Sequence, residues 1–157
     1  RTFTMWQRIQ TLYLLLSGVT ATLLLLLTLF TVTPAGQETI YVANFTGLIV
    51  NGWTSIKYFN LVSFVLTALV TILSFVTIFL YKRRKLQIRL TIVGLLLMVA
   101  AIVAFAYMLW RQADLMQATT HIRFWIILPI INLLCQYLAM RNIIKDDILV
   151  RASNRLR

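Results

Sequence analysis

The sequence predicts an all-α membrane protein: a bundle of four transmembrane helices with both termini cytoplasmic and a short β-hairpin in the first periplasmic loop. Of its 157 residues, 61% are hydrophobic and only 12% are charged, which is about half the charged share of a typical soluble domain. Four uncharged runs are of the length that crosses a hydrocarbon core of about 30 Å as helix. Basic residues gather at the ends of these runs, mainly on one side.

The four runs divide a single integral-membrane domain, residues 1–157, into spans and loops. We expect spans at residues 9–32, 58–81, 90–110 and 124–140. They leave periplasmic loops at 33–57 and 111–123, a cytoplasmic loop at 82–89 and a cytoplasmic tail at 141–157. The first run is too long for the apolar part of a signal peptide and lacks an A-x-A cleavage site, so we expect a retained helix. The fourth contains Pro129 near its start, where a missing backbone donor costs little.

The distribution of charge assigns the two sides of the membrane. Twelve of the fifteen Lys and Arg residues fall on the side of the termini and the 82–89 loop, and only Lys57, Arg111 and Arg123 fall on the other. By the positive-inside rule, the first side is the cytoplasm. Trp110 and Trp125 lie near the expected non-cytoplasmic surface of the membrane, and amphipathic rings prefer such interfaces. These features predict a multi-pass membrane protein with both termini in the cytoplasm.

A basic cluster in the 82–89 loop consists of Lys82, Arg83, Arg84, Lys85 and Arg89. We expect it to anchor the topology through contact with anionic phospholipid, each charge contributing about 1 kcal/mol. A dedicated site for an acidic lipid, or for an acidic patch on a partner, is the alternative. A net charge of +11 would suggest nucleic acid as the partner of a soluble chain. Because the charges here flank apolar spans, lipid headgroups are the expected partner and nucleic acid is not.

The first periplasmic loop contains two short β-rich segments separated by turn-forming residues. Residues 39–45 and 48–50 favour strands, and the sequences NFTG at 44–47 and NG at 51–52 favour turns. An isolated hairpin is marginal in water, so we expect this one to pack on the bundle or on another subunit. The second periplasmic loop is short and polar, and extension of the third helix into it is one possibility.

Residue types that carry chemistry are scarce. All four acids, Glu38, Asp114, Asp146 and Asp147, lie outside the expected spans, and no Lys, Arg or His lies inside one. The spans therefore show no proton relay. The single histidine, His121, excludes a haem held by two histidines, and we expect it to be solvated rather than to bind a metal with Asp114. We also expect Cys135, in mid-span, to be an inert thiol. The sequence thus predicts no catalytic residue, metal site or cofactor, and a protein that is not an enzyme.

Weakly polar residues form stripes within the spans. In the second span they recur at helical spacing, and in the fourth two amides share one face; the residues are Ser63, Thr67, Thr71, Ser74, Asn132 and Gln136. We expect these residues to make contacts between helices or between subunits, because Asn and Gln are costly when they face lipid. A polar pocket for a quinone headgroup or a small solute on the Asn132 and Gln136 face is the alternative.

Three segments are distinctive as sequence: MWQRIQTLYLLLS at 5–17, RRKLQIRL at 83–90 and AMRNIIKDDILVRASNRLR at 139–157. With them the chain resembles, over essentially its whole length, a family of unknown function made up of small four-helix inner-membrane proteins of Bacteroidetes. The family has no assigned activity. The resemblance therefore implies a fold, a topology and a Gram-negative inner membrane, but no chemistry.

Two functional hypotheses remain open at this point. The first is a non-catalytic accessory or structural subunit of a larger inner-membrane complex, such as a respiratory or other energy-transducing assembly, with larger integral-membrane subunits as partners. The second is a free-standing carrier or channel for small solutes, formed by a homo-oligomer. The second requires that the Asn132 and Gln136 face line a water-filled path.

Overall fold

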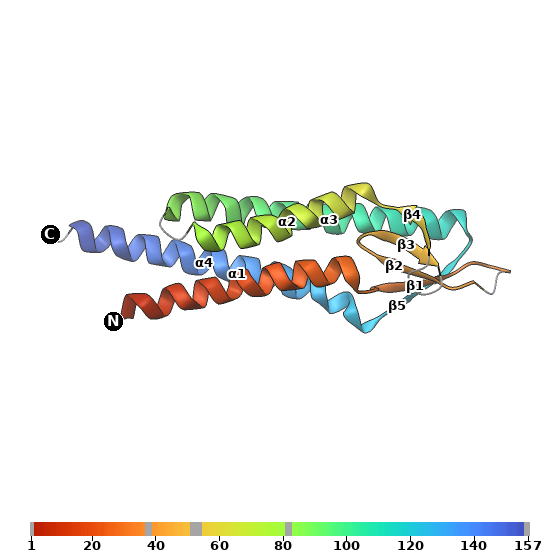
Figure 1. Ribbon diagram of the computed structural model, residues 1–157, viewed down its shortest axis with the longest axis horizontal. Helices are drawn as coiled ribbons and strands as arrows, with labels where there is room; N and C mark the ends of the chain where they lie inside the picture. The colour runs from red at the N-terminus through yellow and green to blue at the C-terminus, as the bar shows by residue number, and fades with distance from the viewer. Residues whose placement is uncertain (1, 37–38, 51–54, 81–82, 156–157) are drawn as a thin grey trace.

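Four long helices run side by side along one axis, and a small sheet lies at one end of them (Figure 1). The computed structural model describes residues 2–36, 39–50, 55–80 and 83–155. The helices are α1 (Thr2–Leu26), α2 (Leu61–Phe79), α3 (Arg84–Leu115) and α4 (Ile127–Arg155). All four are long and apolar enough to cross a membrane, which confirms the predicted number of such helices. Both termini lie at the end opposite the sheet; we call the two ends the termini end and the sheet end.

Each helix packs against its neighbours in the chain, and α1 also packs against α4, so the four close into a ring. The helix bounds differ from the uncharged runs at several points. Helix α1 ends at Leu26, and Phe30–Thr33 form a strand instead of its last turns. An uncharged run of Thr, Val and Phe does not by itself distinguish helix from strand. Helices α3 and α4 continue beyond the expected spans, to Leu115 and Arg155.

The sheet has five antiparallel strands in the order β4-β3-β2-β1-β5. They are β1 (Phe30–Thr33), β2 (Tyr41–Asn44), β3 (Gly47–Val50), β4 (Ser55–Phe59) and β5 (Thr119–Ile122). The predicted hairpin is present as β2 and β3, while the NG at 51–52 lies outside the described residues. The sheet is larger than a hairpin, because β1, β4 and β5 extend it. Strand β5 comes from the second loop between helices and pairs with β1.

The turn between β2 and β3 fastens the sheet to α1. The Oδ1 of Asn44 accepts hydrogen bonds from the backbone N–H groups of Thr46 and Gly47, each at 3.1 Å. Asn44 Nδ2 and Thr46 Oγ1 in turn donate to the backbone oxygen of Leu25, at 3.3 and 2.9 Å. The last carbonyls of a helix have no partner within the helix. The NFTG turn therefore caps α1 at the same time as it reverses the chain.

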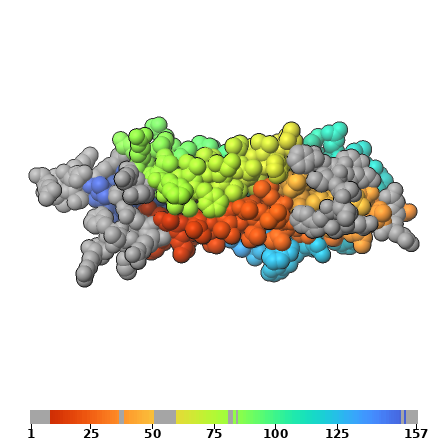
Figure 2. Space-filling view, viewed as in Figure 1, coloured from red at the N-terminus to blue at the C-terminus, as the bar shows by residue number. Residues whose placement is uncertain are grey.

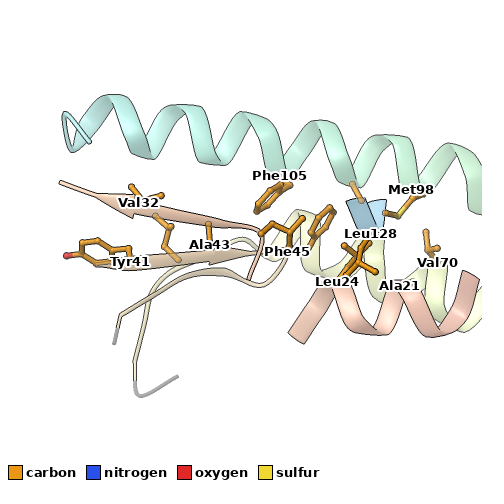
Figure 3. Packing of buried hydrophobic residues seen from close by; sticks show 13 residues of the cluster. Ala21, Leu24, Val32, Tyr41, Ala43, Phe45, Val70, Met98, Phe105 and Leu128 are labelled. Atoms are coloured by element: carbon orange, nitrogen blue, oxygen red, sulfur yellow. The ribbon is translucent and has the colours of Figure 1, made fainter. Parts of the chain in front are cut away.

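One apolar core runs from the middle of the bundle into the sheet (Figure 3). At the junction, the ring of Phe45 stacks on Phe105 of α3 with centroids 4.7 Å apart. The outer surface of the helices is apolar as well, and α1 and α2 form much of the face seen in Figure 2. Exposed side chains on that surface include Leu12, Leu61 and Ile72. An apolar exterior over a partly polar interior is the arrangement that suits helices surrounded by lipid.

Candidate functional site

A network of buried amides and hydroxyls joins α4 to α1. Asn132 Nδ2 donates to the backbone oxygen of Ser17 at 2.7 Å and to Thr20 Oγ1 at 2.8 Å. Gln136 Nε2, one turn further along α4, donates to Asn132 Oδ1 at 2.9 Å. Asn132 is completely buried and Gln136 nearly so. Both amides therefore use their donors inside the chain, on groups of its own helices.

The hydroxyl stripe of α2 also lies inside the bundle. Thr67 Oγ1 donates to the backbone oxygen of Ser63 at 2.8 Å, and Thr71 Oγ1 donates to that of Thr67 at 3.0 Å. Ser74 Oγ lies 3.3 Å from Ser17 Oγ, which connects α2 with α1. Two of these four hydroxyls thus bond within their own helix, and among the described residues only Ser74 makes a hydrogen bond between helices. The Ser63 Oγ accepts and donates no hydrogen bond among the described residues.

Further buried polar groups lie toward the termini end, and the sequence pattern alone did not single them out. Gln10 Nε2 on α1 donates to the backbone oxygen of Asn142 on α4 at 3.2 Å. Gln87 Nε2 on α3 donates to that of Thr77 on α2 at 3.4 Å. Single glutamines near the end of a span look like surface residues in sequence. Their hydrogen bonds to the neighbouring helices, which connect α1 to α4 and α2 to α3, are apparent only in the structure.

The space around the amides is small. Gln136 Oε1 accepts no hydrogen bond among the described residues and faces a cavity of about 10 Å³, which Ser74, Thr91 and Gly94 also line. A volume of this size is at the lower limit for holding a single water molecule. Among the described residues, the face that carries Asn132 and Gln136 is thus packed against other helices and does not border an open channel.

A much larger cavity, of about 530 Å³, lies at the sheet end between α3, α4 and the sheet. Ile102, Phe105 and Leu109 line it from α3, and Pro129 and Leu133 line it from α4. From the sheet region, the lining includes Leu29 and Phe30 at the start of β1 and Phe45 in the turn between β2 and β3. Thr120 of β5 supplies the one hydroxyl of the lining. The size lies within the range of about 300–1,000 Å³ of small-molecule sites, but the wall is almost wholly apolar. No sequence motif predicts this cavity, because the residues of its wall come from segments that are far apart in the sequence.

The basic cluster lies at the termini end, between α2 and α3. Arg83 precedes the first turn of α3, and Arg83, Lys85 and Arg89 are exposed. Lys82 lies outside the described residues, and of Arg84 only the backbone is described. The exposed members thus lie at the opposite end of the bundle from the large cavity, so the two features form separate surfaces.

The residues considered for metal binding or nucleophilic chemistry lie on three different elements, β5, α3 and α4. His121 is exposed on β5, Asp114 is exposed near the end of α3, and Cys135 is a buried free thiol on α4. The described part of the chain contains no group of three or more His, Cys, Asp or Glu side chains that could hold a metal ion.

Comparison with known proteins gives one match. The family model described as "Domain of unknown function (DUF4293)" matches residues 6–156. No curated protein and no solved structure matches the chain.

Proposed function

The chain belongs to the DUF4293 family, a domain of unknown function, and from this premise we propose that it is a non-catalytic accessory subunit of a larger complex in the bacterial inner membrane. Respiratory and other energy-transducing assemblies are the class of complex that we consider first. In this proposal the partners are larger integral-membrane subunits.

The packed polar interior is the observation that carries the proposal. Asn132 and Gln136 donate to groups of the same chain, and the cavity beside Gln136 is only about 10 Å³. A carrier or channel needs a polar path whose groups can exchange partners with a solute. Here the amides instead hold α1 against α4. This arrangement favours a rigid structural role over transport through the single chain.

The end of α4 offers a surface on which a partner would dock. Figure 1 shows α4 projecting past α1 at the termini end. Ile148 and Leu149, in the last two turns of α4, are exposed by 60% and 53%, next to the charged residues Lys145 and Asp147. Adjacent exposed apolar side chains among charged ones are typical of an interaction surface. The projecting helix supports docking of another subunit at this end.

The orientation in the proposal follows from the basic residues. Arg83, Lys85, Arg89 and Arg141 are exposed at the termini end, and positive charge favours the cytoplasmic side of an inner membrane. Contact of these residues with anionic phospholipid would hold the termini end at the cytoplasmic surface. The sheet would then face the periplasm, and the Bacteroidetes inner membrane suggested by the resemblance is the expected location.

The proposal is tested by purifying a tagged copy from its native membrane in mild detergent, followed by native electrophoresis and mass spectrometry. We expect a reproducible set of larger subunits to accompany the protein. Replacing Ile148 and Leu149 together with Gln should remove these subunits. The matched change of Arg141 and Lys145 to Gln, on the same helix, should leave them bound. A lone monomer or homo-oligomer from the native membrane would contradict the proposal, and a homo-oligomer would make solute transport between copies the next hypothesis.

A further inference from the structure

The large cavity at the sheet end has a second feature besides its apolar wall, which is a fixed cation at its edge. Arg123 precedes α4, and its backbone N–H donates to the oxygen of Leu29, a lining residue, at 2.9 Å. Its Nη1 donates to Thr28 Oγ1 at 2.7 Å. These two bonds fix Arg123 next to a residue of the cavity lining while its side chain remains exposed; neither Arg123 nor Thr28 itself lines the cavity.

From this pairing we propose that the cavity is a lipid site, which takes one acyl chain of an anionic phospholipid and holds the headgroup phosphate at Arg123. This site is independent of the proposed subunit role and of the basic cluster, which lies at the other end of the bundle. The argument rests on the mouth of the cavity, on its wall and on the charge at its edge.

The mouth of the cavity faces sideways, between α3 and α4. Ala106 and Trp110 of α3 and Ile130 of α4 line it and are exposed, Trp110 by 71% and Ile130 by 57%. In a helix bundle that crosses a membrane, an opening on this side meets lipid rather than water. Acyl chains are therefore the apolar groups available to enter at the highest concentration, and they enter without loss of hydration.

The wall selects for a hydrocarbon chain over a polar ligand. Behind the mouth lie Phe105, Leu109 and Leu133, and the stacked ring of Phe45 closes the inner side. The only polar side-chain groups of the lining are the Thr120 hydroxyl and the Trp110 indole. A ligand such as a quinone buries carbonyl groups, which need hydrogen-bond donors when they leave water. This wall offers few such donors, whereas a saturated or unsaturated acyl chain needs none.

The charge at the edge selects the headgroup. A guanidinium stays protonated at any physiological pH and presents a planar set of donors that matches a phosphate. None of the described acidic residues forms an ion pair with Arg123, so its charge is not neutralised within the described chain. Trp110 and Trp125 lie at the same end and mark the level of the headgroups. An anionic phospholipid satisfies the cation and the apolar cavity together.

The first experiment is native mass spectrometry of the full chain released from mild detergent after purification from membranes that contain phosphatidylglycerol. We expect a phosphatidylglycerol to remain bound to the wild type. Ala106→Trp fills the mouth and should abolish this retention. Ala100→Trp places the same side chain at another exposed position of α3 that does not line the cavity, and it should retain the lipid.

Arg123 is tested separately, through headgroup preference. In a variant with Trp110 as its sole tryptophan, phospholipids brominated on the acyl chain quench the indole that lines the cavity. We expect brominated phosphatidylglycerol to quench more strongly than brominated phosphatidylcholine at the same mole fraction. Arg123→Gln should remove this difference, while Arg141→Gln, exposed midway along α4 and outside the cavity lining, should preserve it.

Each other outcome overturns the inference. Retention of no lipid, or of a quinone or a free fatty acid in its place, would rule out a phospholipid site. Equal retention by Ala106→Trp and Ala100→Trp would mean that the lipid lies elsewhere on the helices. An unchanged headgroup preference in Arg123→Gln would remove the phosphate from this position. Co-purified subunits do not enter any of these readouts, so failure here is distinct from failure of the subunit proposal.

Discussion

The Nδ2 of Asn132 lies 2.7 Å from the backbone oxygen of Ser17, so an amide on α4 bonds to the main chain in the middle of α1. The same nitrogen reaches Thr20 Oγ1, and Thr20 Oγ1 itself donates to the backbone oxygens of Leu16 and Ser17. Because the acceptor at Ser17 is a backbone oxygen, no substitution of the Ser17 side chain can compensate for the loss of the Asn132 amide. Asn132 is completely buried, so its loss leaves the groups that it bonds to without access to water.

Asn132→Leu should lower the free energy of unfolding by about 1–3 kcal/mol, because Gln136 Nε2 loses its acceptor and both Thr20 Oγ1 and the backbone oxygen of Ser17 lose the Asn132 donor. Thr20→Val should cost less, and a double-mutant cycle of the two should give a coupling of about 1 kcal/mol. Reversible unfolding in mixed micelles measures these values. Leu134→Ala, at an exposed position on α4, is the control with little expected effect. Additive effects of Asn132→Leu and Thr20→Val would contradict the network.

Replacement by Ala should have different effects at Gly94 and at Gly18, which both lie within helices. A Cβ added at Gly94 would lie 3.5 Å from Gln136 Oε1, which is ordinary contact distance. A Cβ added at Gly18 would lie 3.0 Å from Cζ of Phe75. Replacing Gly by Ala within a helix gains up to about 1 kcal/mol where space allows. We therefore expect Gly94→Ala to raise the unfolding midpoint and Gly18→Ala to lower it or leave it unchanged. An unfolding midpoint that falls only for Gly94→Ala would contradict the packing described around these two glycines.

Phe45 should matter more for stability than its place in a surface loop suggests. Phe45→Leu removes the ring that stacks on Phe105 and should cost about 1 kcal/mol or more. The same substitution at Phe79, which is 79% exposed on α2, should change the unfolding free energy very little. Limited proteolysis of the two variants gives a second measure, since a detached sheet becomes open to cleavage. Equal stability of the two variants would mean that the sheet does not depend on α3.

The proposed orientation predicts which introduced thiols are reached from the periplasm. In a Cys135→Ala background, a membrane-impermeant maleimide should label Ile40→Cys, at an exposed position beside the sheet, in intact cells with a permeabilised outer membrane. Lys85→Cys, exposed at the termini end, should react only after the inner membrane is opened. The reverse order of labelling would place the termini in the periplasm and contradict the orientation.

The four helices could be predicted from the sequence because each contains an uncharged apolar run of about the length that crosses a membrane. The sheet could be predicted only in part. The β2 and β3 hairpin has local turn residues, but β5 reads as a short polar segment and all four of its residues are exposed. Its partner β1 lies some 90 positions earlier in the chain and continues an apolar run. Pairing over that distance leaves no local pattern.

The candidate sites show the same division. The amides of α4 could be singled out, because Asn and Gln are conspicuous in an apolar run. Which groups they bond to could not, since the backbone oxygen of Ser17 carries no sequence signal. The large cavity could not be predicted either. Its wall combines ordinary apolar residues such as Leu29, Ile102 and Leu133, which become a site only through their arrangement in space.

The pairing of β1 with β5 also bears on the order in which the protein is completed during synthesis. Strand β1 leaves the ribosome directly after the first helix, whereas β5 follows only after the third. Under the proposed threading, β1 lies on the far side of the membrane without its partner β5 until three helices have been inserted. A chain with one helix left out delivers β5 to the wrong compartment, and its sheet stays open at β1. Under that threading, the five-stranded sheet can be completed only after all three preceding helices have been inserted, and a misthreaded copy keeps an unpaired edge on β1.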